Sequence, residues 1–217
     1  LTGINQKIVD LQVLYVEVDS FIYYNSSQVA NVNDLKSKII TSLTSYAKSS
    51  DLNRFGGRFK YSKVLNVIDN IDKSITSNIT RVKIRRNLNA LINQFAQYEL
   101  CFGNRFNVKP EGLNIKSTGF RIQGQSDTVF ITDTPNADKL TGVISIVKRD
   151  ETTGTNIVVV KSAGTVDYVH GEVNLTTINI VSTDKPNNIV EVQAFPDSND
   201  VIGCLLYTSD AADEGWC

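Results

Sequence analysis

The first apolar and polar positions of the chain alternate, as in a half-buried β-strand. Residues 11–24 contain mostly β-branched and aromatic side chains, and polar residues such as Glu17 and Asp19 fall at every second position. A turn cluster follows at residues 25–27. We therefore predict that the chain begins with a strand.

The period then changes to that of helices. Apolar residues recur at four-residue steps from Leu35 to Ala47, and Asn31 or Asn33 can cap the first turn of this predicted helix. The paired glycines at 56–57 indicate a tight turn rather than a phosphate-binding loop, because no Walker or dinucleotide motif surrounds them. A second helix is predicted to follow, with Ser62 as its cap.

Residues 79–86 alternate again and predict a strand with one basic face, formed by Arg81, Lys83 and Arg85. Residues 87–96 fit a helix or a strand, and residues 97–102 return to strand alternation. The polar stretch at residues 114–118 is the best candidate for a linker.

Beyond residue 117 the pattern is that of short strands separated by turns, with a hairpin loop at residues 150–154. The whole pattern predicts an α+β fold, in which a strand-helix-helix-strand unit precedes a β-rich unit of short antiparallel strands. The strands predicted in the second unit span residues 119–123, 128–132, 142–149, 156–161, 166–169, 172–181 and 189–195.

Charge divides the chain in a similar way. Residues 52–116 hold twelve basic and four acidic residues, a net of +8, and residues 117–203 hold six basic and eleven acidic residues, a net of −5. We therefore expect two domains, a basic one at residues 1–116 and an acidic one at residues 117–203.

The two ends of the chain suggest a fragment of a longer protein. The sequence contains no methionine and opens with Leu1, and residues 204–217 resemble the translation of an adapter used in transposase-based sequencing libraries. We expect this tail to be non-native. Without it, Cys101 is the only cysteine, so we expect neither a disulfide framework nor a cysteine-rich metal site.

Candidate catalytic groups are few. The only histidine, His170, lies in a turn between two predicted strands and has no nucleophile motif beside it. Glu17 and Asp19 point to one face of a strand, where they form a solvated surface or pair with the basic segment. We therefore predict no enzyme, no catalytic or metal-binding residues, no cofactor and no small-molecule substrate.

The basic strand is the strongest candidate site. We predict that Arg81, Lys83 and Arg85, with Arg86 beside them, form a protein interface. One alternative is a nucleic-acid-binding module that uses residues 52–116, although the strand lacks the interleaved aromatic residues of a stacking platform. We do not expect nucleic acid or a membrane as a partner, since no apolar run approaches the ~20 residues of a membrane span.

A second alternative is a carbohydrate-binding or adhesin-like β domain at residues 117–203. Such a domain needs an exposed aromatic platform, and the aromatic residues that could form one are scattered along the sequence. These residues are Phe120, Phe130, Tyr168 and Phe195.

Several long blocks resemble the large baseplate wedge protein of contractile-tailed, myovirus-type bacteriophages, which is related to the J-type baseplate family. The resemblance covers most of residues 10–203. The blocks that carry it are residues 15–19, 55–64, 68–79, 101–106 and 114–120.

This resemblance implies a baseplate-J-like domain at residues 1–116 and a structural role without catalytic residues. In that family, copies pair, join other wedge proteins and close into the ring around the tail hub. We therefore expect a virion protein of the tail baseplate, assembled in the cytoplasm of the host bacterium, with a second copy and other wedge proteins as its partners.

Overall fold

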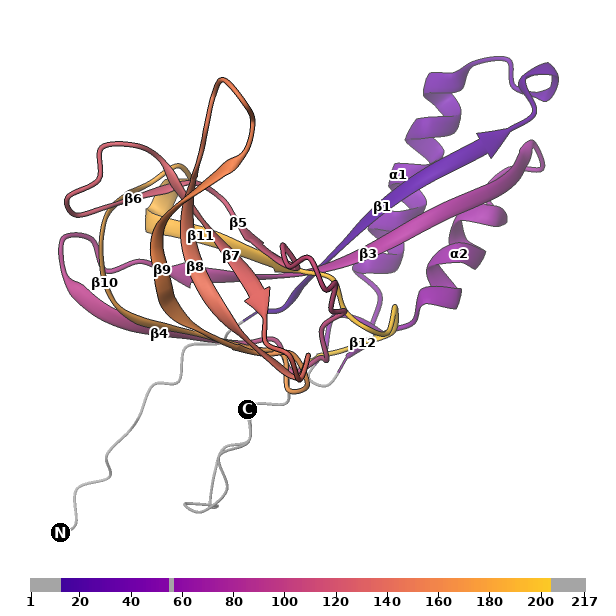
Figure 1. The fold of residues 1–217 in the computed structure, drawn as a ribbon. Coiled ribbons are helices and arrows are strands. Elements are labelled where there is room, and N and C mark those ends of the chain that lie inside the picture. Colours follow the sequence, from indigo (N-terminus) through magenta and orange to yellow (C-terminus); the bar gives the residue numbers. More distant parts are fainter. Residues whose placement is uncertain (1–12, 55–56, 204–217) are drawn as a thin grey trace, which may run out of the picture.

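The computed structural model describes residues 13–54 and 57–203 (Figure 1). The adapter-like tail at residues 204–217 and Gly56 of the predicted tight turn lie outside these ranges. In chain order, the elements are β1 (Tyr15–Tyr24), η1 (Ser26–Gln28), α1 (Val32–Ala47), β2 (Arg58–Phe59), α2 (Tyr61–Asp69), β3 (Ile75–Asn89), β4 (Phe95–Cys101), β5 (Ile115–Ser117), β6 (Phe120–Ile122), β7 (Val129–Pro135), β8 (Thr141–Arg149), β9 (Asn156–Asp167), β10 (Glu172–Thr183), η2 (Pro186–Asn188), β11 (Ile189–Ala194) and β12 (Val201–Ile202).

The predicted α+β class is wrong, because the fold is mostly β, with 48% strand and 16% helix. The predicted strand-helix-helix-strand unit is not a separate unit of the fold, because its last strand, β3, is much longer than expected and continues into a larger sheet. β3 includes the start of the ambiguous segment at residues 87–96, and it pairs with β11 from near the end of the described chain. The pattern of alternation shows that a strand exists but not which distant strand pairs with it.

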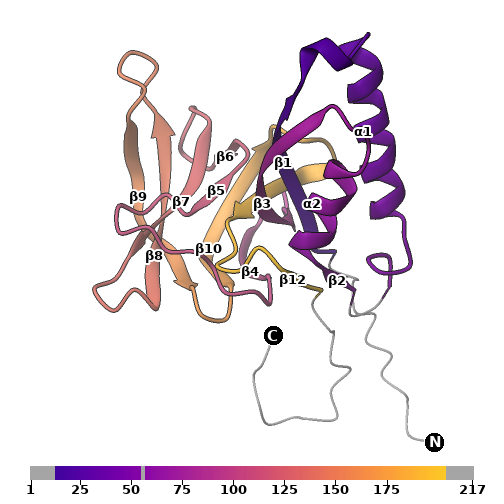
Figure 2. The same cartoon turned by 90° about the vertical axis from the view of Figure 1, so that its right-hand side faces the viewer.

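A four-stranded antiparallel sheet has the order β1-β3-β11-β5. Its β1–β3 part is a long two-stranded ribbon, and α1 and α2 lie along one side of it (Figures 1 and 2). β1 is at the end of the order, so β3 is its only strand partner among the described residues.

The two helices begin in different ways. The Asn31 side chain accepts a hydrogen bond from the backbone N–H of Asn33, so the cap predicted for α1 is confirmed. Ser62 does not cap α2, which begins at Tyr61. The backbone N–H of Tyr61 donates instead to the carboxylate of Asp200 at 2.8 Å, so a distant loop supplies the cap.

Five strands, β6 to β10, close into a barrel, because β9 pairs with both β8 and β10. β9 is one continuous strand where the sequence predicted two, and its Gly164 explains how it passes close to β10. A Cβ atom at Gly164 would lie 2.0 Å from the carbonyl oxygen of Asn174. The hairpin loop predicted at residues 150–154 is confirmed, with Gly154 at a φ of 69°.

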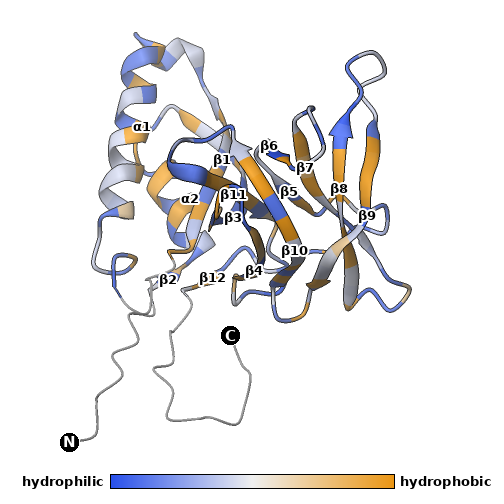
Figure 3. Cartoon of the chain, turned by 90° about the vertical axis from the view of Figure 1, so that its left-hand side faces the viewer, coloured by the Kyte–Doolittle hydropathy of each residue, from blue (hydrophilic) through white to orange (hydrophobic). Residues whose placement is uncertain are grey.

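The prediction of a linker at residues 114–118 is also wrong, because β5 occupies the centre of this segment and joins the sheet to the barrel. The Ser117 hydroxyl accepts a hydrogen bond from the backbone N–H of Ile131 in β7, and Asp133 of β7 accepts one from that of Ile115. Apolar residues line the barrel strands, whereas α1 is largely polar (Figure 3). The domain boundary at residue 116 stays a prediction.

Candidate protein interface

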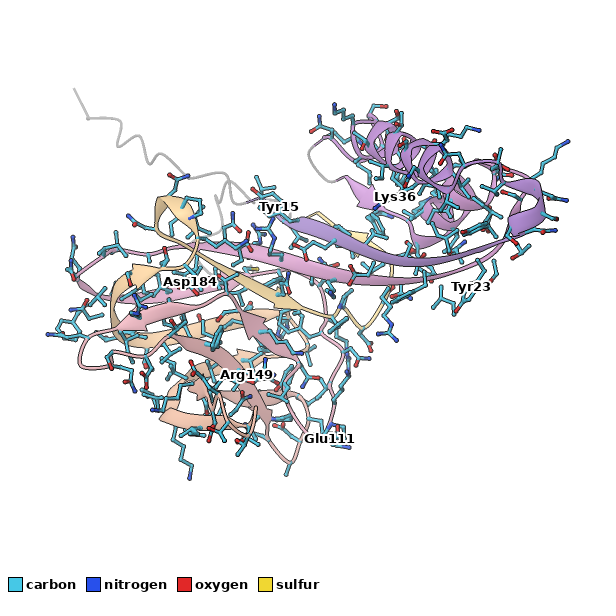
Figure 4. The ribbon with its side chains drawn as sticks, turned by 90° about the horizontal axis from the view of Figure 1, so that it is seen from above. Tyr15, Tyr23, Lys36, Glu111, Arg149 and Asp184 are labelled. Carbon is cyan, nitrogen blue, oxygen red and sulfur yellow. The ribbon has the colours of Figure 1, made fainter. Side chains whose placement is uncertain are left out.

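The β1–β3 ribbon presents two faces of different character. Val82 and Ile84 of β3 are buried on the face that packs against the helices. The opposite face, here called the outer face, carries Glu17, Asp19, Phe21 and Tyr23 of β1 and the β3 residues paired with them. Figure 4 shows Tyr23 on the side of the ribbon away from the helices.

Arg85 lies at the centre of a polar network on the outer face. Its guanidinium donates to Glu17 at 2.7 Å and to Glu191 of β11 at 3.0 Å, and it lies 4.1 Å from the centroid of the Tyr15 ring. Gln193 of β11 donates to the second oxygen of Glu17 at 2.7 Å. The network therefore connects three adjacent strands and neutralises much of the charge of Arg85.

The other predicted interface residues occupy three different environments. Lys83 forms an ion pair with Asp19 at 2.5 Å, whereas Arg81 is exposed further along the same face. Arg86 is only 3% exposed and lies on the opposite face of β3. The structure thus brings Arg81, Lys83 and Arg85 together, and it separates Arg86 from them.

The pairing of Glu17 and Asp19 with the basic segment is confirmed by these two ion pairs. Their carboxylates lie between the cations, so the outer face is a row of alternating charges rather than a uniformly positive surface. A phosphate backbone would meet negative charge at these positions, and a protein partner with mixed charges fits them better.

An apolar patch that the sequence analysis missed lies on the outer face near the far end of the ribbon. Phe21, Tyr23 and Ile79 are 60%, 54% and 51% exposed, and Phe21 is directly opposite Ile79 in the strand register. Aromatic residues are enriched in the centres of protein interfaces. The signal was visible in the strand pattern, because apolar residues occupy the same alternating positions as the charged ones.

A second missed feature is a buried carboxylate at the barrel end of the sheet. Asp133 accepts hydrogen bonds from the Tyr168 hydroxyl at 2.6 Å, from the Asn114 amide at 2.9 Å and from the Ile115 backbone. Burial, together with the bond to Asp133, raises the pKa of Tyr168 far above its ordinary value, so its hydroxyl remains a donor. All donors and acceptors are used, which indicates a structural role.

Other candidate chemistry is sparse among the described residues. His170 lies in the turn between β9 and β10, as predicted, and its ring lies 2.8 Å from the carboxylate of Asp167, which raises the pKa of His170. Within residues 13–54 and 57–203, no group of three or more His, Cys, Asp or Glu side chains could hold a metal ion. Neither helix in those ranges is long and apolar enough to cross a membrane.

The aromatic residues considered for a carbohydrate platform do not gather on one surface. Phe120 and Tyr168 are buried in the core, and Phe130 and Phe195 are half-buried. Lys83 and Lys109 lie 6.0 Å and 5.5 Å from the centroid of the Phe195 ring, which they flank. These four residues therefore contribute to packing rather than to an open binding platform.

A comparison with protein families matches residues 12–87 to the family described as baseplate structural protein gp6, C-terminal domain III. The matched segment includes β1 and most of β3, which form the ribbon and its outer face, and the two helices α1 and α2 that lie along the ribbon. No curated protein matches the chain. The family match supports a structural protein of a phage tail baseplate that assembles with other baseplate proteins, and it does not point to an enzyme.

Proposed function

We propose that the chain is a baseplate wedge subunit of a contractile phage tail. In this proposal it pairs with a second copy and joins other wedge proteins in the ring around the tail hub. The family match to the ribbon segment supports the baseplate role, and the earlier resemblance to the wedge protein supplies the finer assignment.

The observation that carries the proposal is the outer face. It places an exposed apolar patch of Phe21, Tyr23 and Ile79 beside alternating charges, of which Arg81 is exposed. An apolar centre with a charged margin is the usual anatomy of a specific protein interface. Ring closure needs contacts on more than one surface of each subunit, so this face is one of at least two.

The sharpest test is a single charge reversal, Arg81→Glu. Reversal of Lys83 or Arg85 would break ion pairs within the sheet, so a loss of assembly could not be distinguished from a loss of folding. Arg81 is exposed, so its reversal avoids this problem. The chain is co-expressed with the other baseplate proteins of its phage, and the mass of the complexes is measured by light scattering during size-exclusion chromatography. Lys161→Glu, the same reversal at an exposed position of β9, is the matched control.

We expect Arg81→Glu to reduce complex formation at least about tenfold, with the control unchanged. Circular dichroism establishes that both variants keep the fold. Normal assembly by Arg81→Glu removes Arg81 from the proposed interface. If the unaltered chain forms neither pairs nor complexes with the baseplate proteins, the wedge assignment itself is wrong.

A further inference from the structure

The free edge of β1 differs from the edges that folded proteins usually expose. β1 is ten residues long and contains neither proline nor lysine, and its register with β3 is regular from Tyr15 to Tyr23, with a shift only before Tyr24. It has no strand on its second side within the described part of the chain. Long edges of this kind attract further strands unless charges, prolines or bulges protect them. Its two carboxylates, Glu17 and Asp19, lie on the outer face and are already paired with cations.

An apolar groove lies along this edge on the helix side of the ribbon. Its volume is about 340 Å³, and it is open to solvent. Two of its residues from α1, Val32 and Ile40, are 50% and 55% exposed although they face other apolar side chains across the groove. The groove is lined by Val18, Ser20, Ile22 and Tyr24 of β1 and by Val32, Leu35, Lys36, Ile39, Ile40 and Leu43 of α1.

The groove exists because two helices cover only two strands. Neighbouring strands lie about 4.8 Å apart, whereas packed helices lie about 8–10 Å apart. α2 packs against both β3 and α1. From these general spacings we infer that α1 extends past β1 by about the width of one strand. A single further strand beside β1 would lie under this overhang and complete the layer.

We propose that an extended segment of another baseplate protein adds to the sheet beside β1, with apolar residues at every second position and basic residues between them. Its apolar side chains would enter the groove, and its basic side chains would lie on the outer face beside Asp19 and Glu17. The Asp19 side chain is still 55% exposed despite its ion pair with Lys83, so it can accept a second cation. Only the origin of this segment rests on the proposed function.

A second copy of the chain does not fit this edge. If two copies paired through antiparallel β1 strands, about a two-fold axis perpendicular to the sheet, both α1 helices would lie on the same face of the joined sheet. Each α1 would then overlie the β1 of the other copy, and the axes of the two α1 helices would lie only about 5 Å apart. Packed helices have interaxial distances of about 8–10 Å, so the two helices would clash. The groove accepts a strand that carries no helix of its own.

Synthetic peptides test this inference directly. The probe is an acetylated, fluorescein-labelled ten-residue peptide of alternating valine and lysine, and fluorescence anisotropy measures its binding to the full chain. A peptide of the same composition in scrambled order tests the alternation, and an alternating valine and glutamate peptide tests the charge. We expect the first peptide to bind at least about tenfold more tightly than either of the others, a difference of about 1.4 kcal/mol.

Variants locate the binding site. Ile40→Lys places a charge in the groove at an exposed helix position and should weaken binding about tenfold, and Val32→Lys repeats the test should the first variant fail to fold. Leu140→Lys, at an exposed apolar position before β8, is the matched control and should have no effect. Equal binding of the scrambled peptide, equal loss with the control variant, or no binding at about 1 mM peptide would overturn the inference.

These peptide results are independent of the assembly test. A chain that forms complexes but ignores the peptides keeps the proposed function and loses the added strand. A chain that binds the alternating peptide but forms no complex keeps the strand site and loses the wedge assignment.

Discussion

The barrel and the ribbon use the same kind of strand in opposite ways. In the barrel, β9 and β10 close the cylinder, and the buried carboxylate of Asp133 has a donor for each oxygen. In the ribbon, β1 has no second strand partner among the described residues, and three large apolar side chains are more than half exposed on the outer face. The buried Asp133 site is satisfied within the chain, whereas the ribbon presents a strand edge and apolar side chains to a partner.

This difference assigns the stability of the fold mainly to the barrel and the contacts with partner proteins mainly to the ribbon. Substitutions in the barrel core should unfold the chain, and substitutions on the outer face should change its association while the fold remains.

The largest effect is expected from Asp133→Ala. The substitution leaves the buried Tyr168 hydroxyl, the Asn114 amide and the Ile115 backbone N–H without their acceptor, so we expect a loss of about 3–5 kcal/mol in the free energy of unfolding, measured by urea denaturation. Asp127→Ala removes a half-exposed partner of Lys148 and should cost at most about 1 kcal/mol. Equal losses would contradict the structural role of the buried carboxylate.

A smaller loss in the free energy of unfolding is expected from the polar network around Arg85. Arg85→Ala leaves Glu17 and Glu191 without their shared cation, and we expect about 2 kcal/mol of destabilisation in the same denaturation assay. Arg81→Ala changes an exposed residue on the same strand and face, and its cost should stay within about 0.5 kcal/mol. If Arg81→Ala were the more costly of the two, the polar network would not hold the three strands together.

The apolar patch should affect association far more than stability. Tyr23→Ser should change the free energy of unfolding by no more than about 0.5 kcal/mol, because the side chain is already mostly in water. Complex formation with baseplate proteins should fall markedly in light-scattering measurements, because aromatic residues dominate interface energies. Phe95→Ser alters an even more exposed aromatic residue on β4 and should leave complex formation unchanged.

The smallest effect concerns the titration of His170, the only histidine in the sequence. Asp167 raises the pKa of His170 above its ordinary value of 6.5, so NMR titration should show a midpoint above 6.5. The protonated ring stabilises the fold below pH 6.5, and this contribution is lost as the pH rises through the raised pKa. Asp167→Asn should return the midpoint towards 6.5, and an unchanged midpoint would remove Asp167 as the cause.

The sequence predicted features that depend on neighbouring residues. The Asn31 cap, the hairpin loop at residues 150–154 and the alternation of β3 each follow from a few adjacent side chains. The pairing of Glu17 with the basic strand was one of the two predicted possibilities, because a strand pattern indicates which side chains share a face.

The features it missed depend on residues far apart in the chain. Arg85 donates to both Glu17 and Glu191, and Glu191 lies 106 positions after Arg85 in the sequence. Asp200 caps α2, which starts 139 positions before it. Period-two alternation does not specify strand order, so the closure of the barrel and the insertion of β11 beside β3 could not be inferred. The α+β assignment failed for the same reason.

The position of β11 also determines the order in which the molecule can be completed during synthesis. β1, α1, α2 and β3 are synthesised before β11, so the long β3 strand gains its second neighbour only when residues 189–194 have been made. The cap of α2 arrives later still, with Asp200. The sheet therefore stays incomplete while the residues between β3 and β11 are synthesised, and elements far apart in the sequence complete it together.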